Sequence, residues 1–384
     1  MKHTLKIILL TLLIVLLVAE LGFVLHLSRR AQEPEVTTAP TAAPTQPPTN
    51  PPTEPPTEPP TEPPTEPPTE PPVSYTFSFA GDCTLGTYKD KWYSAQGFIK
   101  VIGENYDHPF QNVRQYFEND DFTIINLEVV LADKGYSVGK TFTFRGPTAY
   151  SQIMSGSSVE AVTLANNHTM DYGEDGYKST KKVLTDAGIH YAENYSSTLI
   201  TLDKGLVVGL YALGDDVGGI DQKRAVSDIK KLKEDGAELI IVAAHWGKEG
   251  QYRPTATQEK LGRAMIDAGA NIIYGHHPHV LQPIEEYNGG IIYYSMGNFC
   301  FGGHTNPRDK DSVLIQQEVI RTHDGAVSLG ELTLIPCSIS SSDRNNYQPT
   351  PYEVGSEMYN RVLAKLKGVF DGSNLDVDYS NMSF

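Results

Sequence analysis

The sequence predicts a layered α/β domain that follows an N-terminal apolar segment and a proline-rich linker. From residue 73 onward, short runs rich in β-branched residues alternate with amphipathic stretches of helix length. Strands that alternate with helices are typical of layered α/β architecture. Polar side chains directly follow several of the strand-like runs. Because ligands bind outside the carboxyl ends of strands in such folds, this pattern predicts a site at one edge of a sheet.

The expected elements can be placed along the chain. Strands are expected over residues 75–80, 122–126, 161–164, 206–212, 239–244, 272–274 and 291–294. Helices are expected over residues 110–118, 176–187, 221–234 and 257–268. Residues 313–320 and 327–334 flank a His-Asp-Gly turn and predict a strand pair. An amphipathic pattern over residues 357–369 predicts a helix in a C-terminal segment, 341–384, that ends in a polar tail.

Composition narrows the class of protein. The chain has 384 residues, which is enough for one large α/β domain or two small ones. The formal charge is −16; residues 1–72 contribute −4, from four Lys/Arg and eight Glu, which leaves −12 for the rest. An acidic body argues against a nucleic-acid partner, because phosphate binding needs basic patches. Cys83, Cys300 and Cys337 are too scattered for a zinc-finger spacing and are expected to be buried thiols, although one bridge is possible.

Residues 1–28 are expected to form a short cytoplasmic end and a membrane anchor. Residues 7–27 are a continuous apolar run, interrupted only by Thr11, Glu20, Gly22 and His26. This length is close to the ~20 residues that a helix needs to cross a bilayer. It exceeds the core of a cleavable signal peptide, and no small-residue cleavage site follows. We therefore expect an uncleaved, single-pass signal anchor.

Residues 29–72 are expected to form a disordered Pro/Thr/Glu-rich linker. From residue 51 the unit Pro-Pro-Thr-Glu occurs five times without a break. Proline removes hydrogen-bond donors and fixes φ, so polyproline II remains, and the repeats reach roughly 70 Å at ~3.1 Å per residue. A stalk of this kind suits a domain that extends through a cell-wall layer. The sequence therefore predicts cell-membrane localisation with the globular domain on the extracytoplasmic side.

Potential metal ligands follow successive strand-like runs. Near the expected strand ends lie Asp82, Asn126 with Glu128, Asn167 with His168 and Asp171, His245 with Glu249, the run His276 to His279, and Asn298. Taken singly, each has an ordinary explanation as a turn residue, a cap or a hydrogen-bonded buried side chain. Together they place five of the 11 histidines at strand ends, beside carboxylates. His277 and His279 are two positions apart, so in an extended segment both can point the same way.

This mixture of ligand types indicates a particular chemistry. Carboxylate, imidazole and amide ligands suit divalent Mn, Fe or Zn ions, whereas a structural zinc site is rich in cysteine. We expect two such ions. Two ions bridged by a carboxylate ~3.5–4 Å apart can hold a hydroxide and clamp an ester or phosphoryl group under attack. A nearby histidine can then protonate the leaving group.

The same strand-end motifs support a resemblance to a known family. They are Gly81-Asp82, Asn126-Leu127-Glu128, Ala165-Asn166-Asn167-His168, His245-Trp246-Gly247, Gly275-His276-His277-Pro278-His279 and Ser295-Met296-Gly297-Asn298-Phe299. In these motifs, which span residues 75–301, the sequence resembles the bacterial capsule synthesis proteins of the CapA type. That family is linked to poly-γ-glutamate capsules and belongs to the calcineurin-like metallophosphoesterase superfamily.

The resemblance implies a fold and a set of site residues. It implies a metallophosphatase-like sandwich of two β-sheets flanked by helices (α/β/β/α) over residues 73–340. By the same analogy Asp82 and His279 hold one metal, Asn167, His245 and His277 hold the second, and Glu128 bridges both. His168 would be the acid or the transition-state stabiliser. One position departs from the superfamily pattern, because Thr84 stands where a histidine is usual, and Glu128 replaces a more usual Asp.

Three functions fit these observations. The leading one is a membrane-anchored, metal-dependent hydrolase or transferase of capsule assembly that acts on an anionic polymer such as poly-γ-glutamate. The alternative is a non-catalytic subunit that binds the polymer through metal during export, while other membrane capsule-synthesis proteins supply the chemistry. The third is a general secreted phosphodiesterase or nucleotidase, which fits the superfamily but does not account for the His-His-Pro-His run.

Overall fold

The computed structural model describes residues 71–214 and 219–370. The expected anchor at residues 7–27, nearly all of the linker and residues 371–384 lie outside the described residues. Within the two described ranges, no helix is both long enough and apolar enough to cross a membrane.

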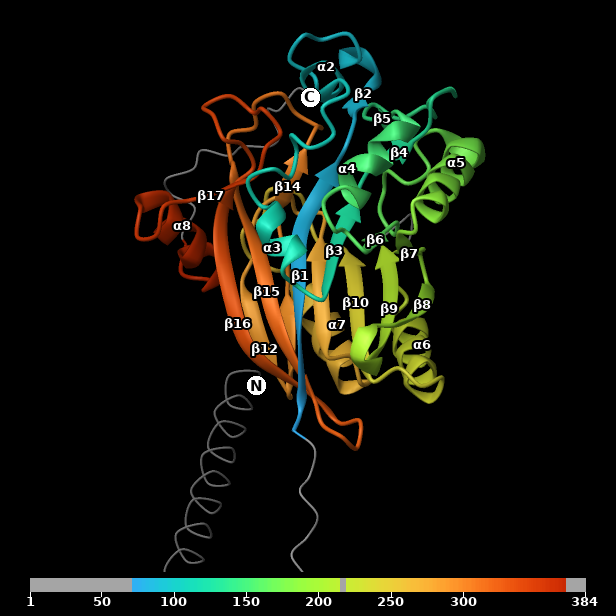
Figure 1. The fold of residues 1–384 in the computed structure, drawn as a ribbon, viewed down its shortest axis with the longest axis vertical. Coiled ribbons are helices and arrows are strands. Elements are labelled where there is room, and N and C mark those ends of the chain that lie inside the picture. Colours follow the sequence, from blue (N-terminus) through green and yellow to red (C-terminus); the bar gives the residue numbers. More distant parts are fainter. Residues whose placement is uncertain (1–70, 215–218, 371–384) are drawn as a thin grey trace, which may run out of the picture. The chain divides into compact units, whose positions relative to one another are not determined.

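Two large β-sheets form the centre of this body (Figure 1). The first has the order β17-β16-β15-β1-β3-β6-β7, with β14 pairing alongside the end of β1. Its strands are β1 (Val73–Thr84), β3 (Phe122–Leu127), β6 (Ala161–Thr163), β7 (His190–Ala192), β14 (Asn298–Phe301), β15 (Asp311–Arg321), β16 (Val327–Ser338) and β17 (Thr350–Pro351). Strands β1, β3, β6 and β7 run parallel, while β15 pairs antiparallel to β1.

The second sheet has the order β12-β13-β11-β10-β9-β8. Its strands are β8 (Ser196–Thr201), β9 (Val207–Gly214), β10 (Leu239–His245), β11 (Ile272–His276), β12 (Ile284–Tyr287) and β13 (Gly290–Tyr293). The four central strands are parallel and the two edge strands are antiparallel to their neighbours. A small third sheet contains β2 (Thr87–Tyr88), β4 (Val130–Leu131) and β5 (Phe144–Gly146).

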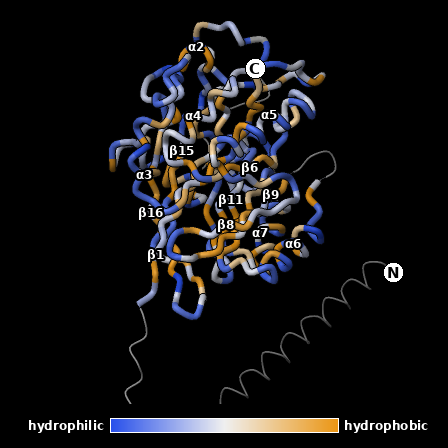
Figure 2. Tube along the Cα trace, turned by 45° about the vertical axis from the view of Figure 1, so that its right-hand side comes forward, coloured by the Kyte–Doolittle hydropathy of each residue, from blue (hydrophilic) through white to orange (hydrophobic). Residues whose placement is uncertain are grey.

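The buried apolar residues define the layers. One cluster fills the space between the two large sheets and includes Phe77 and Phe79 of β1 and Ile241 of β10. A second cluster packs the other face of the first sheet against α2 (Phe98–Ile102), α3 (Arg114–Glu118), α4 (Ser151–Ser155) and α5 (Gly173–Asp186). A third packs the other face of the second sheet against α6 (Gln222–Glu234) and α7 (Ala256–Asp267). The order is helices, sheet, sheet, helices, and Figure 2 shows the apolar segments concentrated along these elements.

Most expected strands and helices are present, with shifted ends. The expected helix over residues 110–118 is wrong in its first turn, because α3 begins at Arg114. The turn before it is held by Asn112, whose side chain donates to Gln348 and Thr350 instead of projecting from a helix. The unexpected strands include β8 and β12, the two edges of the second sheet. Both are partly exposed and polar, so they lack the apolar run that marks the central strands.

The C-terminal segment packs on the first sheet. Strand β17 pairs with β16, and α8 (Glu357–Leu366) lies against β15 and β16. Arg361 donates two hydrogen bonds to Asp311, at 2.6 and 2.7 Å. The expected helix over residues 357–369 ends earlier, at Leu366, because the chain turns at Gly368 with φ of +68°.

Tyr274 joins the two large sheets beneath the edge where the polar residues gather. It belongs to β11, and its hydroxyl donates to the carbonyl oxygens of Ala80 in β1 and Ile124 in β3. The ring is completely buried against Phe79, with 5.2 Å between ring centroids. This contact fixes the spacing between the two sheets next to Asp82.

Candidate metal centre

The carboxyl ends of strands from both sheets meet at this edge. In the first sheet, Asp82 of β1 pairs in register with Asn126 of β3 and with Asn298 of β14. In the second, His245 of β10 pairs with His276 of β11. Gly81 permits the close approach of β1 and the segment before β14, because a Cβ there would collide with the carbonyl oxygen of Gly297. The strand ends therefore deliver carboxylate, imidazole and amide groups to one place.

Asp82 is fully buried and is surrounded by nitrogen atoms. Its Oδ1 lies 3.0 Å from His276 Nδ1 and accepts a hydrogen bond of 2.8 Å from Asn126. Its Oδ2 lies 3.0 Å from His279 Nδ1. Burial alone would raise the pKa of the Asp82 carboxyl, but the two histidines outweigh it and hold that pKa well below its usual range. Asp82 is therefore an anion in this environment.

Glu128 is the second buried carboxylate and has a different environment. It follows β3 and is fully buried, with Oε1 3.7 Å from His245 Nε2 and 3.9 Å from His279 Nε2. Neither carboxylate oxygen has a hydrogen-bond partner in the described part of the chain. Burial raises the pKa of Glu128 well above its usual range, and the nearby Asp82 charge adds to this effect, while His279 opposes it.

His279 lies between the two carboxylates. Its Nδ1 approaches Asn298 Oδ1 at 3.0 Å, in addition to Asp82. Burial lowers the pKa of His279, but the charges of Glu128 and Asp82 outweigh this and raise it to about 10. The backbone at His277 and His279 has φ of +93° and +55°. The expectation that these two histidines project from an extended segment is therefore wrong: β11 ends at His276, and a strained loop directs both rings into the site.

His245, His277 and Asn167 form the other side of the group. His245 Nε2 lies 2.8 Å from Asn167 Oδ1, and its ring centroid is 4.7 Å from that of His277. Burial lowers the pKa of both histidines, and each is lowered further by a neighbouring histidine. Both are therefore neutral imidazoles, the form that binds a metal ion.

His168 is held by a carboxylate and an aromatic ring. Its Nδ1 donates to Oδ2 of the fully buried Asp171 at 2.6 Å, and its ring packs on Phe144 at 4.3 Å. Lys140 pairs with Asp171 Oδ1 at 3.0 Å. Burial lowers the pKa of His168, although Asp171 acts in the opposite direction. Because Nδ1 carries the donated proton, Nε2 is the nitrogen left to accept one.

The group fits divalent metal ions. Most of the buried polar atoms that lack a hydrogen-bond partner, among residues 71–214 and 219–370, belong to it: Asp82 Oδ2, both oxygens of Glu128, His245 Nδ1, both ring nitrogens of His276 and His277 Nδ1. Ligand atoms of Asp82, Glu128 and His279 lie within 4.8 Å of one another. Unsatisfied buried groups are costly unless they coordinate a metal. Oxygen and imidazole donors without thiolate suit Mn, Fe or Zn.

The structure brings all six expected metal ligands, Asp82, Glu128, Asn167, His245, His277 and His279, into one connected group. It also places two residues there that the sequence did not assign. His276 contacts Asp82 and packs edge-on against Tyr274, with 4.0 Å between ring centroids. Glu249 lies near His277 and His279. Both occur in the strand-end motifs, but residue order alone does not show which members of a motif face the site.

Two further expectations concern Thr84 and the three cysteines. Thr84, which stands at the position where a histidine is usual in the superfamily, is fully buried at the end of β1. Its hydroxyl has no hydrogen-bond partner among the residues that the structure describes. Cys83, Cys300 and Cys337 are buried free thiols, as expected. Burial raises the pKa of the Cys83 thiol, so it is a neutral core residue.

Comparison with known proteins identifies the class. Residues 76–303 match the model of the family described as bacterial capsule synthesis protein PGA_cap. "Capsule biosynthesis protein CapA" of Bacillus anthracis is 32% identical over 293 residues, which cover 69% of this chain and 67% of that protein. The chain therefore belongs to the bacterial capsule synthesis protein family.

Other relatives have related names. "PGA biosynthesis protein CapA" of Bacillus subtilis (strain 168) is 34% identical over 271 residues, covering 65% of this chain and 68% of that protein. "Probable polyglutamine synthesis accessory protein Rv0574c" of Mycobacterium tuberculosis is 27% identical over 263 residues, which cover 57% of this chain and 66% of that protein. Among solved structures, a purple acid phosphatase from yellow lupin is 11% identical over 76% of this chain and 55% of that one. Its TM-score of 0.33 is too low to support an argument about fold or chemistry.

Proposed function

We propose that this chain is a metal-dependent hydrolase or transferase of capsule assembly that acts on an anionic polymer of the poly-γ-glutamate type. One observation carries the proposal: side chains from both sheets converge on Glu128, a fully buried carboxylate without a hydrogen-bond partner among the described residues. The names of the relatives from the two Bacillus species supply the context of capsule and PGA biosynthesis.

The residues divide into two sets around Glu128. Asp82 and His279 would hold one ion, and Asn167, His245 and His277 the second, with Glu128 between them. When bound, such ions lower the pKa of water and stabilise charge on a carbonyl or phosphoryl oxygen. His168, oriented by Asp171 at 2.6 Å, would protonate the leaving group or stabilise the transition state.

A second function is favoured by one position. Thr84 stands where the superfamily usually has a histidine, so one ion has one fewer imidazole than expected. A weakly held ion suits a polymer-binding subunit, in which metal bridges the protein and polymer carboxylates during export. Other membrane proteins of capsule synthesis would then perform the chemistry.

Turnover separates these two functions. The full chain is incubated with Mn²⁺ or Zn²⁺ and either poly-γ-glutamate or a generic phosphodiester, and bound metal is measured in parallel. We expect metal-dependent turnover that is lost in His245→Ala and kept in Glu234→Gln, a control on the exposed end of α6. Bound metal and retained polymer without turnover would favour the polymer-binding subunit. Turnover that survives His245→Ala would contradict the proposed active site.

We also propose that residues 7–27 anchor the chain in the membrane and that the Pro-Thr-Glu linker carries the globular body outward. The proposal is supported by the length of the apolar run and by the repeats. External protease added to intact cells should release the body by cutting the linker. Protection of the linker until the cells are lysed would contradict this orientation.

A further inference from the structure

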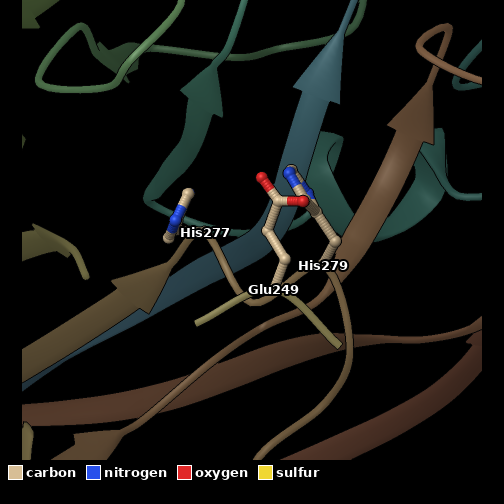
Figure 3. A group of neighbouring side chains, drawn as sticks. All are labelled: Glu249, His277 and His279. Atoms are coloured by element: carbon tan, nitrogen blue, oxygen red, sulfur yellow. The ribbon is translucent and has the colours of Figure 1, made fainter. Parts of the chain in front are cut away.

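A second group of potential metal ligands adjoins the one centred on Glu128. The Glu249 carboxylate and one ring nitrogen each of His277 and His279 lie within 4.8 Å of one another. His279 also belongs to the group with Asp82 and Glu128. Figure 3 shows the Glu249 carboxylate beside the His279 ring, with His277 on the other side. The two groups are therefore contiguous and share one histidine.

The loop that carries Glu249 is fixed to the histidine segment. It connects β10 to α7, and Gly250 N–H donates a hydrogen bond of 2.9 Å to the carbonyl oxygen of Pro278, the residue between the two histidines. The side chain of the fully buried Gln282 donates to the Gln251 carbonyl at 2.7 Å. These two contacts, to the residues directly after Glu249, fix where Glu249 stands relative to His277.

The same loop is tied to the C-terminal helix. Tyr252 donates to Asp309 Oδ2 at 2.8 Å, and Lys365 of α8 donates to both oxygens of Asp309 at 3.0 and 2.7 Å. The Lys365 side chain is completely buried. At the start of the loop, Gly247 has φ of +88°, and a Cβ there would collide with the side chain of Gln258. The placement of Glu249 is therefore a feature of the fold, although its own side chain is exposed.

We infer that Glu249 is a further ligand of the divalent cation that His277 would hold with Asn167 and His245, and that it closes the solvent-facing side of the metal centre beside His279. The inference rests on the proposed metal centre. The part that concerns Glu249 is supported by the grouping of its carboxylate with His277 and His279 within 4.8 Å and by the fixed loop that carries it. Carboxylate and imidazole are a common ligand pair for Zn and Mn.

The position of Glu249 also orders the two ions with respect to solvent. Its group contains one exposed and two partly buried residues, whereas Asp82 and Glu128 are fully buried. The cation at Glu249 is therefore the outer one, and an anionic chain that enters from solvent reaches it first. The chemical class expected at this ion is a carboxylate-bearing polymer or another oxyanion.

Titration of the metal-free full chain with Mn²⁺, followed by calorimetry, tests the inference. We expect two bound ions in the unmodified protein, and a dissociation constant for one of them that is weaker by roughly tenfold or more in Glu249→Gln. Glu249→Asp should recover part of this loss. The matched control Glu234→Gln should bind as the unmodified protein does. Circular dichroism should show that Glu249→Gln is folded, since the side chain is exposed.

Each contrary result has a distinct meaning. If Glu249→Gln binds both ions with unchanged affinity while His277→Ala loses one, the role of Glu249 is overturned and the proposed metal centre stands. If the unmodified protein binds no Mn²⁺, the metal centre and the role of Glu249 are both overturned.

Discussion

Replacing Glu128 with Gln should stabilise the metal-free protein and abolish its stabilisation by metal. The Glu128 carboxylate is fully buried, and within the described ranges neither oxygen has a hydrogen-bond partner. A buried polar group left unsatisfied costs about 1–3 kcal/mol, and a charged one costs more. Burial raises the pKa of Glu128 well above its usual range, which reflects the cost of ionising it here, whereas Gln has nearly the same shape and cannot ionise. We therefore expect the free energy of unfolding of the metal-free protein to rise by about 1–2 kcal/mol.

With metal bound, the unmodified protein should become more stable than Glu128→Gln. A ligand that binds only the native state stabilises it by about 4 kcal/mol at a thousandfold excess over its Kd. At about 2 °C per kcal/mol for a domain of this size, the Tm of the unmodified protein should rise by about 8 °C. Glu128→Gln, which lacks the bridging charge, should show little of this increase.

Thermal unfolding followed by circular dichroism measures both effects. Each protein is melted once with a chelator and once with excess Mn²⁺, and Glu234→Gln serves as the control because it lies on the exposed end of α6. The reasoning is refuted if Glu128→Gln is less stable than the unmodified protein in chelator and still gains the full increase from Mn²⁺. That result would mean that the carboxylate is satisfied without metal.

Three further predictions concern other residues. Asp171→Asn removes the carboxylate that accepts from His168 at 2.6 Å, so the pKa of His168, already lowered by burial, should fall further in an NMR titration; an unchanged pKa would contradict the contact. Burial raises the pKa of Glu160 to about 7, so its contribution to stability is fully present below its ordinary pKa and is lost as pH rises through 7. Glu160→Gln should reduce the fall in unfolding free energy between pH 5 and 8 by about 1–2 kcal/mol, allowing for partial exposure, and an equally steep fall would count against this. Lys365→Met leaves the buried Asp309 carboxylate without its cation, while Asp311 keeps Arg361, and should lower stability in urea by about 3–5 kcal/mol, whereas the exposed Lys367→Met should have little effect.

The sequence was most informative where burial is complete. Strands β3, β10 and β11 are buried and largely apolar on both faces, and β1 alternates large buried apolar residues with small polar ones, so each gives a clear strand pattern. The edge strands β8 and β12 are half-exposed and carry polar residues, and they left no such signal. The first turn of the helix expected before Glu118 was misassigned because Asn112 hydrogen-bonds to a loop more than 200 positions away, which no local pattern reveals.

In the candidate site, too, some features could be predicted from the sequence and others depend on the folded backbone. Strand ends could be located from the sequence, and the six residues expected to bind metal lie together in one group. The positions of Glu249 and His276 beside this group could not be predicted, because they depend on how the β10–α7 loop and the His-His-Pro-His loop turn. Positive φ at His277 and His279, and the bond from Gly250 to Pro278, are properties of the folded backbone. Sequence order gives neither of them.

Anomalous diffraction from crystals of the protein grown with Mn²⁺ tests the metal centre most directly. The account predicts two peaks about 3.5–4 Å apart, with Glu128 between them. One peak should lie beside Asp82 and the other beside His245 and His277. The absence of any peak within reach of Glu128, in a crystal that binds Mn²⁺ elsewhere, would contradict it.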